Sequence, residues 1–345
     1  MEIKTVTVIG ANGTMGCNIS GIFASFGNAK VYMACRSMEK AEKAVARAAK
    51  SVRAEAIAEN LVPATFDDLP KCVAESDLVF ESVSENFDTK QDIIDRIADH
   101  VRPDAILATG TSGLSIDKLA EMYPEALRSR YIGMHFFNPP YTMTLCEIIE
   151  SQYTDKQMSA DLMEYSKRKL VRTVVNVADT AAFLGNRIGF QFINEACQYA
   201  EMYKDSGGID YIDAILGQFT GRNMPPIATA DFVGLDVHKA IVDNVYANTK
   251  DYARSTFVMP EYMQRLIDEG KLGRKVKQGL YKTVIGENGK KIQYVYDIDS
   301  GEYREKIRYS FPFARKMIDY LHQGDYKMAF DSLKYNHSID RKSVV

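Results

Sequence analysis

The sequence predicts an α/β domain with a doubly wound, mostly parallel sheet, followed by a second, mainly α-helical domain. In the first half of the chain, short apolar runs rich in β-branched residues alternate with helix-like segments. Such alternation implies crossover connections and therefore parallel strands. After about Val177 the apolar residues recur with a helical period instead. A length of 345 residues is sufficient for two hydrophobic cores.

Seven segments of the first half have the composition of buried strands, and three have the pattern of helices. The first strand ends at a glycine, as buried parallel strands often do. The alanine-rich, charged stretch from Ser37 contains no Gly or Pro until residue 60, which favours one long helix. The expected strands are 5–10, 30–35, 77–83, 105–111, 130–137, 146–150 and 172–177, and the expected helices are 14–26, 37–60 and 89–101.

The second half is predicted to be helical and then to change character. Helical periodicity runs over residues 183–205, 209–219 and 236–251, with "DSGG" and "TGRNMPP" as breaks. From about Thr283 the chain is polar and rich in tyrosine, which indicates a small hairpin followed by a helix from about Ala314 to Leu333. The predicted organisation is a first domain at 1–178, a helical domain at 179–283 and an extension at 284–345.

Composition excludes several classes of protein. A net charge of −3, with 26% charged residues, gives no basic surface for nucleic acid or membrane lipid. No run reaches the ~18–20 apolar residues of a membrane helix. The six-residue apolar run near the N-terminus is too short for the core of a signal sequence, so no signal sequence is expected. Five scattered cysteines without a C-x-x-C pair argue against a disulfide framework or a structural metal site. These features predict a cytoplasmic protein without a metal.

The stretch "VTVIGANGTMGCNIS" places three glycines, Gly10, Gly13 and Gly16, between the first strand and the first helix. Amides at a helix N-terminus are unsatisfied donors at the positive end of the helix dipole, so those near Thr14 and Met15 can bind a pyrophosphate. Such a turn in an alternating α/β pattern predicts a Rossmann-like dinucleotide site. The spacing is one residue longer than G-x-G-x-x-G because of an additional asparagine.

The end of the second strand bears on the choice of dinucleotide. An acidic residue there normally accepts a hydrogen bond from the ribose 2′-hydroxyl of NAD. This sequence has Cys35 at that position, followed by Arg36 and Ser37, which can bind a 2′-phosphate. The pattern favours NADP and leaves NAD as the alternative. The less favoured interpretation is that Arg36 is a solvated surface residue.

A histidine and a carboxylate on successive strands indicate acid–base chemistry. In "YIGMHFFNPPYTMTLCEIIE", His135 ends one buried strand and Glu147 lies on the next. A lone histidine is more often structural, but a carboxylate partner can fix its tautomer and stabilise its cation. Oxidation of an alcohol requires such a base, because the hydroxyl loses its proton as hydride leaves carbon.

These residues resemble the L-3-hydroxyacyl-CoA dehydrogenase family. The segment "GMHFFNPPYTMTLCEII" is similar to the family's G-x-H-F-F-N-P segment with its catalytic glutamate. The resemblance runs in family order from about Lys4 to Lys282. Further matching segments are "TGTSGLSIDKLA", "ADTAAFLGNRIG", "PPIATADFVGLDV" and "KLGRKVKQGLYK".

The resemblance implies roles for particular residues. His135 would be the general base and Glu147 its orienting partner, with Ser112 and Asn186 hydrogen-bonding near the reacting oxygen. Taken alone, Ser112 reads as a turn residue and Asn186 as a helix cap. The implied cofactor contacts are Glu85, Lys90, Asn138 and Lys275. This chain departs from the family in its glycine spacing, in the residues after the second strand, and in Ala181-Ala182, where the family has Pro-Gly.

The predicted function is interconversion of a 3-hydroxyacyl-CoA and a 3-ketoacyl-CoA with a nicotinamide cofactor. The protein is expected to be a homodimer. The helical domain is expected to bind the substrate and to form the dimer interface. The tail from Thr283 resembles the segment that follows this domain in multifunctional fatty-acid oxidation proteins, which suggests a hydratase partner. Two alternatives stay open: a related hydroxy-acid dehydrogenase with a lysine base and a substrate without CoA, and a non-catalytic sensor of dinucleotide or CoA.

Overall fold

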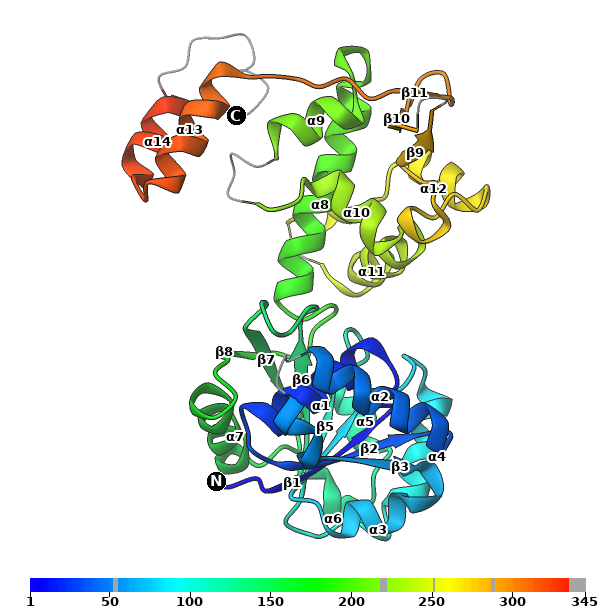
Figure 1. The fold of residues 1–345 in the computed structure, drawn as a ribbon, viewed down its shortest axis with the longest axis vertical. Coiled ribbons are helices and arrows are strands. Elements are labelled where there is room, and N and C mark those ends of the chain that lie inside the picture. Colours follow the sequence, from blue (N-terminus) through cyan, green and yellow to red (C-terminus); the bar gives the residue numbers. More distant parts are fainter. Residues whose placement is uncertain (52–54, 218–221, 251, 287–288, 335–345) are drawn as a thin grey trace. The chain divides into compact units, whose positions relative to one another are not determined.

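The structure is a computed structural model that describes residues 1–345 except 52–54, 218–221, 251, 287–288 and 335–345. The chain divides into an N-terminal unit, Met1–Leu184, and a C-terminal unit, Gly185–Val345. The division falls six residues after the predicted end of the first domain, and the extension from residue 284 belongs to the C-terminal unit. Each unit is described by itself below (Figure 1).

The N-terminal unit is built on an eight-stranded sheet with the order β3-β2-β1-β4-β5-β6-β7-β8. Neighbouring strands are parallel except β6 and β7, which are antiparallel. The predicted doubly wound, mostly parallel sheet is thus confirmed. Its strands are β1 (Thr5–Ile9), β2 (Lys30–Cys35), β3 (Leu61–Thr65), β4 (Leu78–Glu81), β5 (Ile106–Thr109), β6 (Tyr131–Phe136), β7 (Leu145–Glu150) and β8 (Thr173–Val177).

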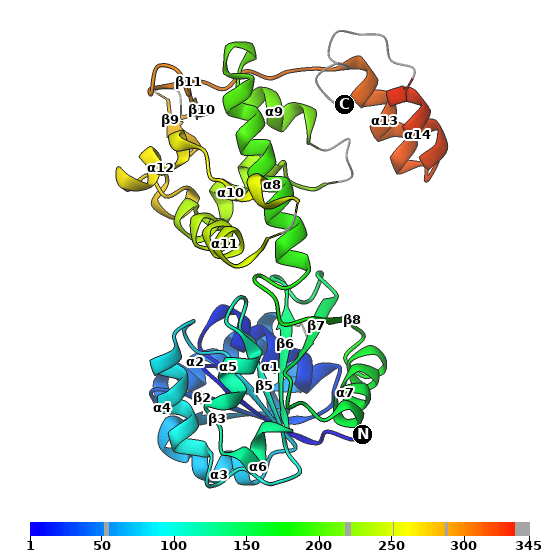
Figure 2. The same ribbon diagram turned by 180° about the vertical axis from the view of Figure 1, so that it is seen from behind.

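Helices cover both faces of this sheet, and each face has its own core. One core packs α1, α2 and α7 on the sheet, and the other packs α3, α4 and α5 on the opposite face (Figures 1 and 2). The helices are α1 (Thr14–Ser25), α2 (Met38–Ser51), α3 (Leu69–Ala74), α4 (Phe87–Ile97), α5 (Ile116–Glu121), α6 (Glu125–Arg128) and α7 (Lys156–Arg168).

Helices α3, α5, α6 and α7 were not among the predicted helices, and two further local features of this unit differ from the sequence prediction. The single helix expected over 37–60 is wrong: α2 ends at Ser51, residues 52–54 lie outside the described part, and a 3₁₀ segment spans Glu55–Asn60. Strand β3 was not predicted. It contains Pro63, which a strand tolerates because β3 lies at the edge of the sheet and one side of its backbone needs no partner.

The C-terminal unit is mainly helical, as predicted, with a small three-stranded sheet of order β11-β10-β9. The sequence predicted a two-stranded hairpin here, whereas the structure has three antiparallel strands. The elements are α8 (Gly185–Met202), α9 (Ile209–Ile215), α10 (Pro226–Val233), α11 (Leu235–Asn248), α12 (Glu261–Asp268), β9 (Tyr281–Ile285), β10 (Lys291–Tyr296), β11 (Tyr303–Glu305), α13 (Pro312–His322) and α14 (Tyr326–Lys334).

The single helix expected from Ala314 to Leu333 is two helices, α13 and α14. The break follows from Gly324, whose φ of +74° is left-handed and open to glycine at little cost. Tyr211, Phe311 and Phe313 are among the buried residues that join this region to the core of the C-terminal unit.

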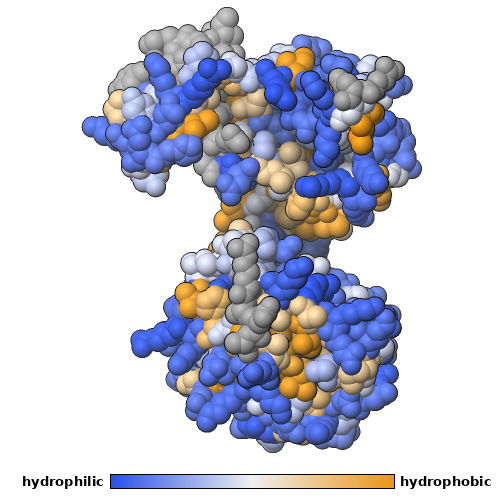
Figure 3. All heavy atoms as spheres, viewed as in Figure 1, coloured by the Kyte–Doolittle hydropathy of each residue, from blue (hydrophilic) through white to orange (hydrophobic). Residues whose placement is uncertain are grey.

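The described part of the chain contains no candidate membrane span. None of the described helices is both long and apolar enough to cross a bilayer. Figure 3 shows hydrophilic side chains over most of the visible surface, with hydrophobic residues in small patches. The described residues also contain no cluster of three or more histidine, cysteine or acidic side chains suited to a metal ion.

Candidate active site

The glycine turn lies where the strand order of the sheet reverses, between β1 and β4. Gly10 has a φ of +82°, and a Cβ atom there would lie 2.5 Å from the carbonyl oxygen of Ser82. A Cβ atom on Gly16 would lie 2.6 Å from the carbonyl oxygen of Gly10. The first and third glycines are therefore required by close packing of the turn on β4 and of α1 on β1, as in dinucleotide-binding folds.

The N-terminus of α1 suits a phosphate group. The helix begins at Thr14, its N-cap Gly13 supplies no side-chain acceptor, and the first turn contains no acidic residue. The amides of Thr14 and Met15 thus have no side-chain cap, and the helix dipole favours an anion there. A nicotinamide dinucleotide fits this turn through its pyrophosphate.

Arg47 stabilises the glycine turn by hydrogen bonds to its backbone. The sequence analysis did not predict a role for this residue. From α2 its Nη2 atom donates to the carbonyl oxygens of Asn12, at 2.6 Å, and Gly13, at 3.1 Å. Its Nε atom donates to the Sγ atom of Cys17 at 3.2 Å. The guanidinium thereby fixes the additional residue of the turn, Asn12, on α2. Only the packing of α2 against α1 reveals this role.

The three residues at and after the end of β2, Cys35, Arg36 and Ser37, have some of the features expected of an NADP site. Cys35 is fully buried, and burial raises the pKa of its thiol, so it is a neutral group rather than an anion. Arg36 is exposed and forms no ion pair with any described residue. Ser37 accepts the amide of Lys40 at 3.4 Å at the start of α2. No acidic side chain replaces the missing ribose acceptor at these three positions.

The predicted pair Glu85 and Lys90 belongs to a larger cluster at the end of β4. Lys90 is buried, and its Nζ atom lies 2.5 Å from Oε2 of Glu81 but 3.9 Å from Oε2 of Glu85. Glu81 also accepts from Thr109 Oγ1, at 2.8 Å. The sequence analysis missed Glu81 because it has the appearance of an ordinary strand residue. Only the structure shows that its carboxylate forms an ion pair with a buried lysine.

Glu85 organises the loop that contains Ser112. Its Oε1 atom accepts the amides of Ser112, at 2.6 Å, and Gly113, at 3.1 Å, and the hydroxyl of Thr111, at 2.6 Å. Ser112 is exposed. The carboxylate thus sets the backbone position of Ser112, whose side chain remains exposed.

His135 and Glu147 lie side by side because the β6/β7 register makes them direct partners. Nδ1 of His135 is 2.7 Å from Oε2 of Glu147, and both side chains are buried. Oε1 of Glu147 accepts the amide of Leu184 at 3.0 Å. A carboxylate so placed accepts the Nδ1 proton, which assigns the tautomer with Nε2 unprotonated.

Aromatic rings enclose this histidine. Phe137 meets the imidazole edge to face with ring centroids 4.6 Å apart, and Phe183 lies at 5.7 Å. Ala182 and Phe183 both adopt left-handed backbone, with φ of 61° and 53°. Ala182 is the position where the family has glycine. The turn places the Leu184 amide on Glu147 despite the cost of a Cβ atom in this conformation.

The other predicted residues have these positions. Asn138 is exposed and follows β6 in the N-terminal unit. Asn186 lies in the first turn of α8, and Lys275 precedes β9; both belong to the C-terminal unit. Lys275 Nζ is held within that unit by Asp236, at 2.5 Å.

A doubly wound sheet, a glycine turn at its switch point and a buried histidine–carboxylate pair together define a nicotinamide-dependent oxidoreductase. The family models make this specific. Residues 5–180 match the 3-hydroxyacyl-CoA dehydrogenase NAD-binding domain, and residues 183–283 match the 3-hydroxyacyl-CoA dehydrogenase C-terminal domain. The chain belongs to the 3-hydroxyacyl-CoA dehydrogenase family, as its sequence motifs predicted.

Individual relatives agree. A probable 3-hydroxyacyl-CoA dehydrogenase of Deinococcus radiodurans is 30% identical over 84% of this chain and 86% of its own length. A probable 3-hydroxyacyl-CoA dehydrogenase of Bacillus subtilis is 30% identical over 73% of this chain, which spans only 31% of that relative. A putative fatty acid oxidation complex trifunctional enzyme of Rickettsia prowazekii is 27% identical over 92% of this chain, which spans 46% of it.

Among solved structures, (S)-3-hydroxybutyryl-CoA dehydrogenase PaaH1 from Ralstonia eutropha is similar with a TM-score of 0.71. It is 32% identical and covers 81% of this chain and 98% of its own. The likeness extends over both units and supports the fold and family together.

Proposed function

We propose that this protein interconverts 3-hydroxyacyl-CoA and 3-ketoacyl-CoA by hydride transfer with a nicotinamide cofactor. The observation that carries the proposal is the buried pair of His135 and Glu147 at 2.7 Å, in a domain of the 3-hydroxyacyl-CoA dehydrogenase family. When bound, the cofactor supplies the hydride acceptor or donor. The chain supplies the acid–base group, the binding surfaces and the orientation.

In the oxidative direction, Nε2 of His135 takes the proton of the C3 hydroxyl while the C3–H electron pair leaves as hydride. The C–O bond becomes a carbonyl, and the imidazole becomes a cation. Glu147 stabilises that cation through Nδ1 and prevents ring rotation. In reverse, the same nitrogen returns the proton to the developing alkoxide.

Six further side chains have proposed supporting roles. Ser112 and Asn186 hydrogen-bond the substrate oxygen and the histidine. Glu85 holds the Ser112 loop, and its neighbour Lys90 keeps the end of β4 in place beside the cofactor. Asn138 and Lys275 are proposed cofactor contacts. The amides of Gly13, Thr14, Met15 and Gly16 are proposed to bind the pyrophosphate.

NADP is the proposed preferred cofactor. The support is the exposed Arg36 without an ion pair among the described residues, next to a neutral thiol where an acid would bind the NAD ribose. A 2′-phosphate would supply the anion that Arg36 lacks. Preference for NADP would direct the reaction toward reduction of the 3-keto group.

The proposed assembly is a homodimer formed through the C-terminal unit. Support comes from an exposed apolar row on α8 at Ile188, Tyr199 and Met202, which share one helical face. A hydratase is a proposed partner because the chain resembles part of a trifunctional fatty acid oxidation enzyme. All five cysteines are buried free thiols, which supports a reducing compartment such as the cytoplasm.

Steady-state kinetics test the proposal. Acetoacetyl-CoA, longer 3-ketoacyl-CoAs and free acetoacetate are each offered with NADH and NADPH, and the 340 nm absorbance is followed. The proposal predicts turnover of the CoA thioesters and none of the free acid. Turnover of acetoacetate alone would favour a hydroxy-acid dehydrogenase, and cofactor binding without turnover of any substrate would favour a sensor.

A further inference from the structure

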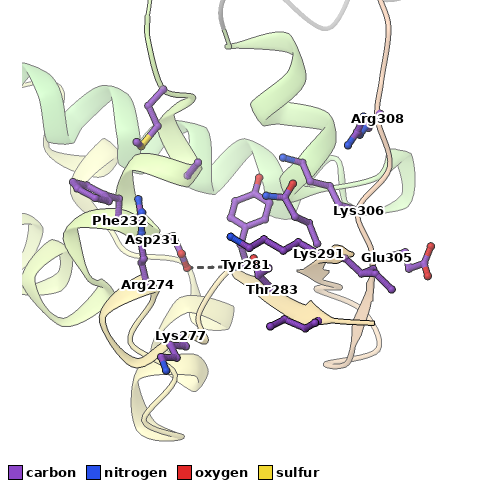
Figure 4. A pocket seen from close by; sticks show the side chains of 15 residues that line it. Asp231, Phe232, Arg274, Lys277, Tyr281, Thr283, Lys291, Glu305, Lys306 and Arg308 are labelled. Atoms are coloured by element: carbon purple, nitrogen blue, oxygen red, sulfur yellow. Dashed lines mark hydrogen bonds between the residues drawn. The ribbon is translucent and has the colours of Figure 1, made fainter. Parts of the chain in front are cut away.

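The C-terminal unit contains a cavity of about 1110 Å³ that the proposed reaction does not use. It lies between one face of the three-stranded sheet, one face of α10 and the turn before β9 (Figure 4). Because all its lining residues belong to one unit, the cavity is a property of that unit alone. Its volume suits a ligand of nucleotide size.

The sheet register explains which side chains form the floor. Tyr281, Thr283 and Ile285 alternate along β9 and therefore point to the same face. On β10, Gln293 pairs with Thr283 and Lys291 with Ile285, so both join that face. The floor of the cavity therefore has both polar and apolar side chains, with Lys291 as its one cation.

The opposite wall is aromatic and cationic. Asp231 and Phe232 lie on α10, and Arg274 stacks on the Phe232 ring with its guanidinium carbon 5.2 Å from the centroid. Lys277 follows in the same turn. After β11, Lys306 reaches back across the cavity until its Nζ atom lies 4.9 Å from the Tyr281 ring (Figure 4).

Five cationic side chains line the cavity against two carboxylates: Arg274, Lys277, Lys291, Lys306 and Arg308 against Asp231 and Glu305. None of the five has an ion pair among the described residues, whereas the nearby Lys275 and Arg304 are both paired. The chain as a whole has 43 basic and 46 acidic residues, so a group of cations without ion pairs is a local excess of positive charge.

The two carboxylates offset this excess of five cations only in part. Oδ1 of Asp231 accepts the amides of Leu280, at 2.7 Å, and Tyr281, at 3.3 Å. Glu305 pairs with Tyr294, which lies on the opposite face from Gln293, so its side chain is directed away from the floor. Figure 4 shows the Glu305 carboxylate pointing away from Lys306.

We propose that this cavity binds a nucleotide-type ligand with at least two phosphate groups. The cations form charge-assisted hydrogen bonds to phosphate oxygens, and Phe232 and Tyr281 supply aromatic surface for a base. Thr283 and Gln293 add neutral hydrogen-bonding groups. The ligand is either a free nucleoside diphosphate or the phosphorylated adenosine of a CoA compound, since both have this chemistry.

Calorimetric titration of the full chain with ADP tests the inference. The dinucleotide turn can also hold ADP, so the wild type is expected to bind two equivalents, one at the turn and one in the cavity. The double variant Lys291→Ala, Lys306→Ala should lose the second equivalent or weaken it by about tenfold or more. The matched control Lys316→Ala, Lys327→Ala removes two exposed cations of α13 and α14 and should keep both equivalents.

A single equivalent in the wild type that the cavity variant retains would overturn the inference, as would two unchanged equivalents in the cavity variant. Adenosine, which lacks phosphate, should not occupy the second site. Between the two sources, tighter binding of adenosine 3′,5′-bisphosphate than of ADP indicates a CoA compound, and the reverse order indicates a free nucleotide. Failure of acetoacetyl-CoA turnover would leave this binding result unaffected.

Discussion

Two histidines of the described chain are deeply buried, and their partners differ in charge. His135, on β6, faces the carboxylate of Glu147 at 2.7 Å. His238, on α11, has its Nε2 atom 2.9 Å from the amide oxygen of Asn194, and its Nδ1 atom has no hydrogen-bond partner. Burial lowers the pKa of His238 to about 4. The comparison teaches that burial disfavours the cationic form of an imidazole, and that a facing carboxylate supplies the opposite charge that this cation needs.

The largest effect is expected from making the first histidine resemble the second. Glu147→Gln gives His135 an amide partner of nearly the same shape but no charge to stabilise its cation. The turnover number for acetoacetyl-CoA reduction should fall about 10³-fold, which is about 4 kcal/mol of transition-state stabilisation. The exposed control Glu125→Gln should retain full activity. A loss of less than about tenfold would show that the carboxylate only orients the ring.

The second test concerns His238 and the pH dependence of stability. Its pKa in the folded protein, about 4, lies below the ordinary histidine value of 6.5, so between these pH values the unfolded chain binds a proton that the folded chain excludes. The contribution of His238 to the free energy of unfolding should therefore be highest above pH 6.5 and lower by about 3 kcal/mol at pH 4.

Urea unfolding at several pH values measures this loss. His238→Gln should be less stable at pH 7 but should show a shallower fall between pH 6.5 and 4. His100→Gln replaces an exposed histidine and should keep the slope of the wild type. Equal slopes in all three proteins would contradict the assignment of this pH dependence to His238.

A smaller effect, on the preference between NADPH and NADH, is expected from a substitution at Arg36. Arg36→Asp should lower kcat/KM for NADPH and raise it for NADH, changing their ratio by about tenfold or more, because a charge beside the 2′-phosphate changes sign. Arg47→Ala serves as a contrast: it loosens the turn at Asn12 and should weaken both cofactors alike. A ratio that stays constant in Arg36→Asp would mean that Arg36 is only solvated.

The sequence predicted much of the fold because buried parallel strands and amphipathic helices leave local patterns. It did not predict β3, whose Pro63 is acceptable only at a sheet edge, or the end of α2 at Ser51. The helix expected near the C-terminus splits at Gly324, where one residue decides the backbone direction. Such departures depend on neighbours that are distant in the sequence.

The candidate site shows the same limit. His135 and Glu147 were predictable as partners because they lie on successive strands, and their register now places them opposite each other. Arg47 and the Glu81–Lys90 pair were not, because their importance comes from contacts between α2 and the turn and between α4 and β4. The cationic cavity likewise requires the register of the small sheet, which no local motif encodes.

The most direct test of the central claim, that His135 is the acid–base group of a hydride transfer, is a paired measurement on His135→Ala. Cofactor affinity is measured by fluorescence titration, and acetoacetyl-CoA reduction is followed at 340 nm. The claim predicts unchanged cofactor affinity with turnover lowered by about 10²–10⁴-fold. Turnover equal to that of the wild type, with cofactor affinity intact, would contradict it.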